Sequence, residues 1–324
     1  METIKGLTNW RLTVRREGDG VTLLRAMTCD RKAVLPDELF GLPVTALQDH
    51  ALAAGAAPAE GEEVRILGGA VSGDWDNRNI AELTLPRFLR HIGDYAFLNC
   101  RAMETLRFSD DLETTGSASF MNCRRFSRLE IRRIGPRQGP ALAFLVRSLQ
   151  QELDVTVLEE DGSVLRLLFP AYFESYTENS AAHHFDLKIV GGGYAYHGVF
   201  RDRTLTLSEY DALWPQYIAQ EHDTDSALRL AYYRLRWPTR LSTQAGERYA
   251  EYLHADPGRA ISLVLREKDM PGLRMLLEPK LPGTETLDAA LEEARRLQMT
   301  EATAILLEKR HAGPAAGRAK TFEL

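Results

Sequence analysis

The chain has 324 residues, of which 44% are hydrophobic and 27% are charged, so it can bury a sizeable core and form two or three structural units. This composition excludes a disordered chain, and a net charge of -6 gives no sign of the basic surface typical of nucleic-acid binders. No run approaches the roughly 18 apolar residues that a membrane span needs, and the N-terminal residues lack the pattern of a secretory signal. We therefore expect a cytoplasmic protein that contacts neither nucleic acid nor membrane.

The first elements expected along the chain are two strands with alternating polarity. Residues 10–14 and 21–24 flank the turn Gly18-Asp19-Gly20, which predicts a β-hairpin. Residues 35–52 follow with a Leu-Pro start and a later Ala-Leu pair, and they are interpreted as the entry unit of a repeat array. The hairpin is then expected to cap that array.

A repeat of 23 residues is the strongest pattern in the chain. Residues 97–101, Phe-Leu-Asn-Cys-Arg, return as residues 120–124, Phe-Met-Asn-Cys-Arg, and the same offset relates Leu83, Leu106 and Leu129. Each unit contains a strand, a Pro or Ser turn, a second short extended piece and a tight turn. Because one unit cannot bury its own apolar face, the constant period predicts stacked coils, that is, a solenoid.

The spacing between the entry unit and the next unit is irregular. Leu52 lies 45 residues before its equivalent Phe97, an interval of about two periods. Residues 64–70 are therefore interpreted as a degenerate coil, and residues 72–79, rich in Asp and Asn around Gly73, as an irregular excursion.

The residues of the repeat resemble those of a known family. Leu85-Pro86 and residues 92–100, Ile-Gly-Asp-Tyr-Ala-Phe-Leu-Asn-Cys, are similar to the BspA-like leucine-rich repeats of bacteria. The resemblance covers about residues 34–133. It implies a binding protein built on short stacked coils, and many proteins with such repeats are thought to act at the cell surface.

The period stops after Ile131, and residues 133–140 read as a turn-rich boundary. A helix is expected from residue 141 to 153, followed by strands at 155–158, 164–168 and 185–189. From Ser208 onward the pattern is helical, with start signals at Asp223 and at Asp256-Pro257. Leu277 recurs as Leu307, an offset of 30 that resembles ankyrin-like helix pairs, although the Thr-Pro-Leu-His signature is absent.

The expected fold class is α+β: a short leucine-rich-repeat solenoid, a small mixed α/β unit and an all-helical, ankyrin-like array. The expected domains are residues 1–133, with the capping hairpin and the repeats, residues 134–207, the mixed unit, and residues 208–311, the helical domain. Residues 312–324, rich in Ala and Gly, are expected to form a flexible tail.

The sequence gives little indication of a catalytic, metal or cofactor site. Cys100 and Cys123 occupy equivalent positions of two units and are interpreted as small apolar residues filling inward positions, since no CxxC spacing accompanies them. His183 and His184 are adjacent on an expected strand and point to opposite faces, which disfavours shared ligation of one ion. The glycine run 191–193 lacks the residues of a phosphate-binding loop and is expected to be a hairpin turn. We predict no catalytic residue, no metal and no cofactor.

Two further clusters are interpreted as structural. Residues 124–128, Arg-Arg-Phe-Ser-Arg, are diluted by acidic neighbours and read as a solvated face rather than a phosphate contact. Aromatic residues at helical spacing are expected to pack in a core, with an interface role for some of them left open. They are Trp214, Tyr217, Tyr232, Tyr233, Trp237, Tyr249 and Tyr252.

Binding to an unknown protein partner is thus the predicted function, as a non-catalytic scaffold. The expected contact residues are the non-core positions of the repeat strands, which form ladders on one exposed face. They are Glu82, Thr84, Thr105, Arg107, Arg128 and Glu130. Two alternatives stay open: a cell-surface adhesin, and an enzyme with its site in the middle unit near His183, His184 and Tyr194.

Overall fold

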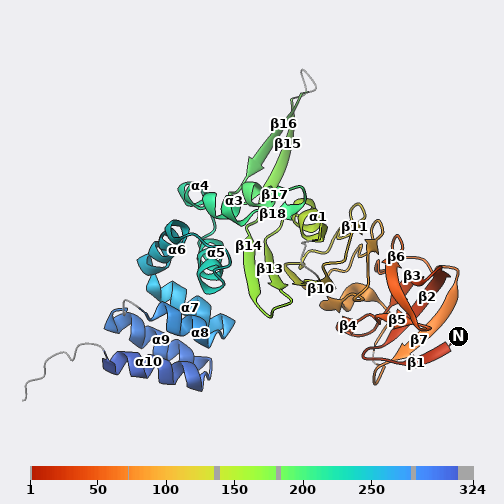
Figure 1. The fold of residues 1–324 in the computed structure, drawn as a ribbon, viewed down its shortest axis with the longest axis horizontal. Coiled ribbons are helices and arrows are strands. Elements are labelled where there is room, and N and C mark those ends of the chain that lie inside the picture. The colour runs from red at the N-terminus through yellow and green to blue at the C-terminus, as the bar shows by residue number, and fades with distance from the viewer. Residues whose placement is uncertain (1, 72, 135–138, 180–183, 279–281, 313–324) are drawn as a thin grey trace, which may run out of the picture. The chain divides into compact units, whose positions relative to one another are not determined.

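The computed structural model describes residues 2–71, 73–134, 139–179, 184–278 and 282–312. The chain divides into two compact units, Met1–His222 and Asp223–Leu324, each of which is described by itself. The first unit contains the β-strands and the second is helical (Figure 1). The sequence predicted that the helical domain begins at residue 208. This division instead leaves the helices between residues 207 and 219 in the first unit.

The N-terminal end of the first unit contributes four strands to an eight-stranded sheet. Its strands are β1 (Glu2–Lys5), β2 (Trp10–Glu17), β3 (Gly20–Met27) and β7 (Glu62–Leu67). β2 and β3 form the expected antiparallel hairpin. β7 pairs with β2 and β1, so the interpretation of residues 64–70 as a degenerate coil was wrong. Val64 and Ile66 are buried in this sheet, which is the reason for their apolar pattern.

The repeats stack as parallel strands in register with the 23-residue period. β4 (Lys32–Val34), β8 (Glu82–Thr84), β10 (Thr105–Ser109) and β12 (Arg128–Arg132) lie side by side in one sheet. Leu83, Leu106 and Leu129 occupy one row across these strands and are fully buried. The shared apolar phase read from the sequence is therefore the core row of the stack.

A second row of short strands closes the coils on another side. It contains β6 (Leu42–Leu47), which also pairs with β5 (Glu38–Leu39), then β9 (His91–Ile92) and β11 (Thr114–Thr115). β6 pairs directly with β9, as Ala46 with His91 and Leu47 with Ile92. The entry unit thus lies against the next coil, and the extra residues of the 45-residue interval include β7 and the 3-10 helix Asn77–Asn79.

The turns of the repeat explain why particular residues recur. Asn99 and Asn122 adopt left-handed backbone conformations, with φ of 64° and 63°, which asparagine tolerates better than most residues. The Asn122 side-chain amide donates to Asn99 Oδ1 at 2.9 Å. A Cβ on Gly116 would lie 2.3 Å from the carbonyl carbon of Gly93. Adjacent coils therefore approach closely at a point where only glycine fits.

The sheet continues beyond the last repeat. After α1 (Ala141–Ser148), β13 (Leu153–Leu158) pairs parallel with β12 and antiparallel with β14 (Val164–Phe169). The expected helix is thus shorter than residues 141–153, because the chain turns into β13. Val155 and Leu167 extend the buried row of Leu129, so the hairpin of the middle segment covers the end of the repeat stack.

The remainder of the first unit is a ribbon followed by short elements. These are β15 (Phe173–Asn179), β16 (His184–Val190), α2 (Tyr194–His197), β17 (Phe200–Arg201), β18 (Thr204–Leu205), α3 (Leu207–Ala212) and α4 (Trp214–Ala219). Gly191–Gly193 connects β16 to α2 and is not the expected hairpin turn. A Cβ on Gly193 would lie 2.0 Å from the carbonyl oxygen of Pro170, so the run permits close packing of the backbone.

Aromatic packing holds α3 and α4 on the first unit. Tyr196 contacts Tyr210 and Tyr217 edge to face, with ring centroids 4.8 and 5.5 Å apart. Tyr210 also packs against Phe169 of β14, and its hydroxyl donates to the carbonyl oxygen of Leu168. These contacts are the reason why α3 and α4 belong to the first unit rather than to the helical domain.

The second unit consists of paired helices. They are α5 (Thr224–Arg236), α6 (Thr243–Ala255), α7 (Pro257–Glu267), α8 (Met270–Leu276), α9 (Thr284–Arg296) and α10 (Thr300–Ala312). α5 contacts α6 and α7, α7 contacts α8 and α9, and α9 contacts α10. Tyr232, Tyr233 and Tyr249 are fully buried here, as expected for core aromatic residues.

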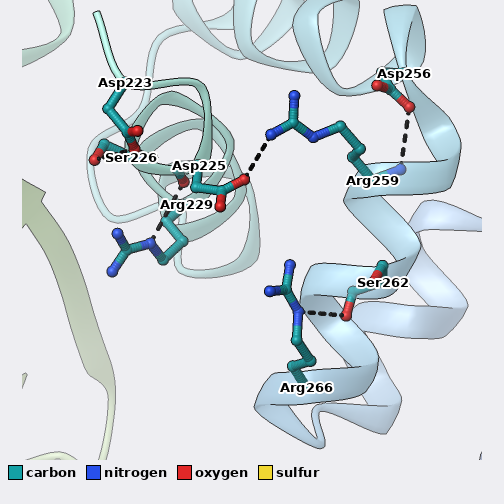
Figure 2. A network of polar contacts seen from close by, with 8 residues as sticks. All are labelled: Asp223, Asp225, Ser226, Arg229, Asp256, Arg259, Ser262 and Arg266. Atoms are coloured by element: carbon teal, nitrogen blue, oxygen red, sulfur yellow. Dashed lines mark hydrogen bonds and ion pairs between the residues drawn. The ribbon is translucent and has the colours of Figure 1, made fainter.

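Capping aspartates begin these helices where the sequence predicted. Asp223 accepts from the backbone N–H of Ser226, and Asp256 accepts from that of Arg259. The Arg259 guanidinium also donates to Asp225 at 2.8 Å and so connects α7 to α5 (Figure 2). Ser208, which was also expected to cap the start of a helix, lies within α3 instead, since the N-cap of α3 is Thr206.

Candidate interaction face

The predicted contact residues lie on the outer side of the sheet formed by β4, β8, β10, β12, β13 and β14. Strand alternation places Leu106 and Phe108 in the core and Arg107 on the opposite side. Arg107 pairs in register with Thr84 on one neighbouring strand and with Glu130 on the other. The repeat thus converts one sequence position into a row of polar side chains across the sheet.

Ion pairs connect four residues across this face. The Arg107 guanidinium donates to Glu130 through Nε at 2.6 Å and Nη2 at 3.1 Å, and to Glu82 through Nη1 at 2.8 Å. Lys32 Nζ lies 2.6 Å from the other carboxylate oxygen of Glu82. We call Lys32, Glu82, Arg107 and Glu130 the charge ladder. It runs over β4, β8, β10 and β12 with alternating sign.

The charges of the ladder stabilise one another. Hydrogen bonds from Lys32 and Arg107 lower the pKa of Glu82, and a hydrogen bond to Glu130 together with one to Glu82 raises the pKa of Arg107. The side chains of Arg107 and Glu130 are each 36% exposed and that of Glu82 is 26% exposed. The ladder is consequently fixed in geometry yet accessible to a partner.

A second ion pair continues the pattern on the hairpin that covers the stack. Arg166 of β14 donates to both carboxylate oxygens of Asp154 of β13, at 2.9 and 2.6 Å. Lys32, Asp154 and Arg166 are not among the residues that the sequence predicted for this face. The register between Lys32 and Glu82 crosses 50 residues without a repeat signal, and β13 carries no repeat motif. Each of β13 and β14 holds a single charged residue, so neither strand shows a charge pattern that could have indicated the face.

The other predicted contact residues differ in accessibility. Arg128 is exposed and Thr84 is half-buried. Thr105, however, is 3% exposed, so it offers little surface to a partner. The structure therefore brings all six predicted residues to one sheet face but presents five of them.

The residues of the enzymatic alternative are only partly described. His183 lies outside the described residues, and His184 pairs with Asn179 at the far end of the ribbon. Tyr194 begins α2, is half exposed and packs edge to face on Tyr172, with centroids 5.3 Å apart. The basic segment 124–128 divides as follows: Arg124, Arg125 and Arg128 are exposed, whereas the Phe126 ring is buried and stacks on Phe120.

The two repeat cysteines occupy equivalent buried positions. The Cys100 thiol donates to the carbonyl oxygen of Leu52 and the Cys123 thiol to that of Phe97. Burial raises the pKa of Cys100, and it raises the pKa of Cys123 to about 12. Neutral thiols in these positions fill space in the coil. Within the described part of the chain, no group of three or more His, Cys, Asp or Glu residues could hold a metal ion.

Residues 74–148 match the family model described as BspA type leucine rich repeat region (6 copies). This segment is a BspA-type leucine-rich repeat region. It spans β8, β10, β12 and α1, so it extends past the boundary predicted at residue 133 and excludes the entry coil formed by β4 and β6.

No curated protein and no solved structure matches the chain. None of the helices in the described residues combines the length and the apolar character needed to cross a bilayer. The BspA-type region is typical of protein-interaction or surface repeat proteins, and three residues of the charge ladder, Glu82, Arg107 and Glu130, lie on its outer sheet face.

Proposed function

We propose that this chain is a non-catalytic scaffold that binds another protein through the outer sheet face of its BspA-type region. One observation carries the proposal: ion pairs hold an alternating row of charges on an accessible sheet, with Glu82, Arg107 and Glu130 on the repeat strands and Lys32 on the neighbouring strand β4. Because ion pairs already restrain these side chains, binding requires less ordering of the surface. Charges of both signs fit a protein surface with complementary charges better than a polyanion.

The helical unit is proposed as a second binding module with an ankyrin-like arrangement. Its helices contact one another in successive pairs, and the capping residues of α5 and α7, Asp223 and Asp256, lie 33 residues apart, the spacing of ankyrin repeats. If the pairs behave as repeats, Leu291→Ala in α9 will increase hydrogen exchange in α9 and α10 far more than in α5 and α6. A uniform increase over the unit contradicts the proposal.

Affinity purification from the native host tests the binding face. Arg128→Glu reverses an exposed charge on the face, and Arg124→Glu makes the same change outside the sheet as a matched control. Arg107 is less suitable because its replacement also removes three ladder bonds. We expect Arg128→Glu to lose a partner that the wild type and Arg124→Glu retain.

The purification also tests the scaffold role itself, and a separate fractionation experiment tests the location of the protein. A partner retained equally by both variants excludes this face, and the absence of any specific partner excludes the scaffold role. Fractionation of the host cells separates a cytoplasmic scaffold from a surface adhesin, which is the second candidate because BspA-type repeats also occur in surface proteins.

A further inference from the structure

The ribbon formed by β15 and β16 extends from the first unit as a sheet of its own (Figure 1). Seven residue pairs join the two strands, from Phe173 with Val190 to Asn179 with His184. Among the described residues, neither strand pairs with a further strand. A two-stranded hairpin alone is only marginally stable in water, so the ribbon lacks the support that the other long strands have.

Exposed apolar side chains concentrate on this ribbon. Of the eleven exposed large hydrophobic residues in the described part of the chain, five lie on β15 and β16. They are Phe173, Tyr176, Leu187, Ile189 and Val190, with exposed fractions of 62%, 65%, 51%, 37% and 46%. A long apolar strand with an open edge is a template for pairing with another strand. The ribbon is therefore a candidate surface for pairing with a strand of another chain.

The register assigns these residues to faces. Tyr176 is opposite Leu187, and Glu174 is opposite Ile189, so all four share one face of the ribbon. The Tyr176 hydroxyl donates to Glu174 on the same face. Phe173 and Val190 lie opposite each other on the other face. The first face thus carries an apolar stripe in which Leu187 is central to β16.

The sequence of β16 is complementary to itself. It reads His-Phe-Asp-Leu-Lys-Ile-Val from His184 to Val190. If two such strands pair antiparallel about Leu187, Asp186 of each copy is opposite Lys188 of the other, and Phe185 is opposite Ile189. Both charged positions then face opposite charges, and the apolar positions form one continuous row.

Neighbouring symmetric registers are unfavourable. When a two-fold axis normal to the sheet relates two antiparallel strands, one residue at the axis lies opposite its own copy, because side chains alternate between faces. Moving this central residue by one position shifts the pairing by two residues. Centring the pair on Asp186 sets two aspartates opposite each other, and centring it on Lys188 sets two lysines opposite each other. The register about Leu187 is the one among these three that pairs opposite charges.

The other edge of the ribbon lacks this property. β15 contains Glu174 and Glu178 but no basic residue. An antiparallel pair of β15 strands about Tyr176 would place these glutamates opposite each other, which is destabilising. Self-association is therefore specified on the β16 edge.

We propose that the chain forms a two-fold homodimer in which β16 pairs antiparallel with β16 of a second copy, centred on Leu187. The two ribbons then form a four-stranded antiparallel sheet. The occupant is a second copy because β16 complements its own sequence in charge and apolar pattern. This interface is separate from the charge ladder, so a failure of the dimer leaves the proposed scaffold function untouched, and the reverse also holds.

Charge-swap variants of the full chain test the register. Lys188→Glu and Asp186→Lys each convert both cross-strand charge pairs into repulsions, so each is expected to raise the dimer dissociation constant at least about tenfold. The double variant Asp186→Lys with Lys188→Asp restores opposite charges and is expected to dimerise again. A mixture of the two single variants is expected to form a heterodimer, since each supplies the charges the other needs. Sedimentation velocity over a concentration series measures all four.

Cysteine crosslinking tests the position of the axis. Opposite residues of antiparallel strands have Cα atoms about 4.5–5.5 Å apart, within reach of a disulfide. Leu187→Cys is expected to give a covalent dimer under mild oxidation. Tyr176→Cys on β15 is the matched control, because three strand spacings, about 14 Å, separate it from its copy. The wild type controls for the three native cysteines.

Two kinds of result overturn the proposal. One is a wild-type chain that stays monomeric at all concentrations, including the case in which the ribbon instead binds phosphatidylglycerol vesicles or a strand of another protein. The other is a dimer whose dissociation constant changes in neither single variant, since its interface then lies elsewhere. Circular dichroism of each variant establishes that the change is in association and not in folding.

Discussion

Removal of the Arg107 charge is the most direct perturbation of the BspA-type stack. Arg107→Met keeps the apolar stem of the side chain and deletes three hydrogen bonds to Glu82 and Glu130. The two carboxylates then lose the cation between them, although Lys32 still pairs with Glu82.

The expected loss of stability follows from exposure. Because all three side chains are between 26% and 36% exposed, each ion pair contributes about 0.2–1 kcal/mol rather than the value of a buried pair. The bidentate geometry with Glu130 favours the upper part of this range. We therefore expect Arg107→Met to lower the free energy of unfolding of the first unit by about 1–2 kcal/mol.

Urea unfolding, monitored by hydrogen exchange of the backbone amides in β8, β10 and β12, measures the free energy of unfolding of the first unit by itself. Arg128→Met is the matched control, because Arg128 is exposed on the same sheet and forms no ion pair with another described residue. The difference between the variants is expected to shrink in high salt. Equal destabilisation by the two variants would refute the ladder as a stabilising element.

Three further predictions concern single positions. Gly116→Ala is expected to destabilise the stack by more than about 2 kcal/mol, measured by thermal unfolding, because the new Cβ meets the Gly93 backbone. Glu82 has a lowered folded-state pKa, so its contribution is present above the ordinary value of 4.5 and is lost as the pH falls below it; Glu82→Gln is expected to flatten the stability profile there. Cys100 and Cys123 are expected to resist thiol labelling in the folded chain, whereas Cys29, only partly buried, reacts first.

For each of these three predictions, one outcome would contradict it. Full stability of Gly116→Ala means that the coils are not in close contact. An unchanged acid profile in Glu82→Gln means that the ladder does not control this titration. Rapid labelling of all three thiols without denaturant contradicts their burial in the coil.

The sequence predicted the register of the repeat because a constant period leaves little freedom. Leu106 and Leu129 lie opposite each other, as an offset of 23 residues requires. The same reasoning failed for residues 64–70, where the interval of 45 suggested a coil. Apolar alternation at Val64 and Ile66 satisfies the N-terminal sheet equally well, and local pattern does not distinguish the two partners.

The period of the repeat also predicted part of the candidate face. Periodicity placed Glu82, Arg107 and Glu130 on one side of the sheet, but it gave no information on Lys32, whose register depends on a connection without repeats. Thr105 shows the other limit, because strand alternation places it on the outer face and yet it is 3% exposed, which the alternation of the strand does not predict. Aromatic contacts across distant segments, such as Tyr210 with Phe169, likewise placed α3 in the first unit.

A site-specific photocrosslinker tests the central claim, that the outer sheet face binds a protein, most directly. Introduced at Thr84, which lies two residues after Glu82 on β8 and in register with Arg107 of β10, the crosslinker is expected to capture a partner in the native host. At Arg124, outside the sheet, it is expected to capture none. Capture at Arg124 without capture at Thr84 contradicts the proposed face and assigns binding to the turns of the BspA-type region.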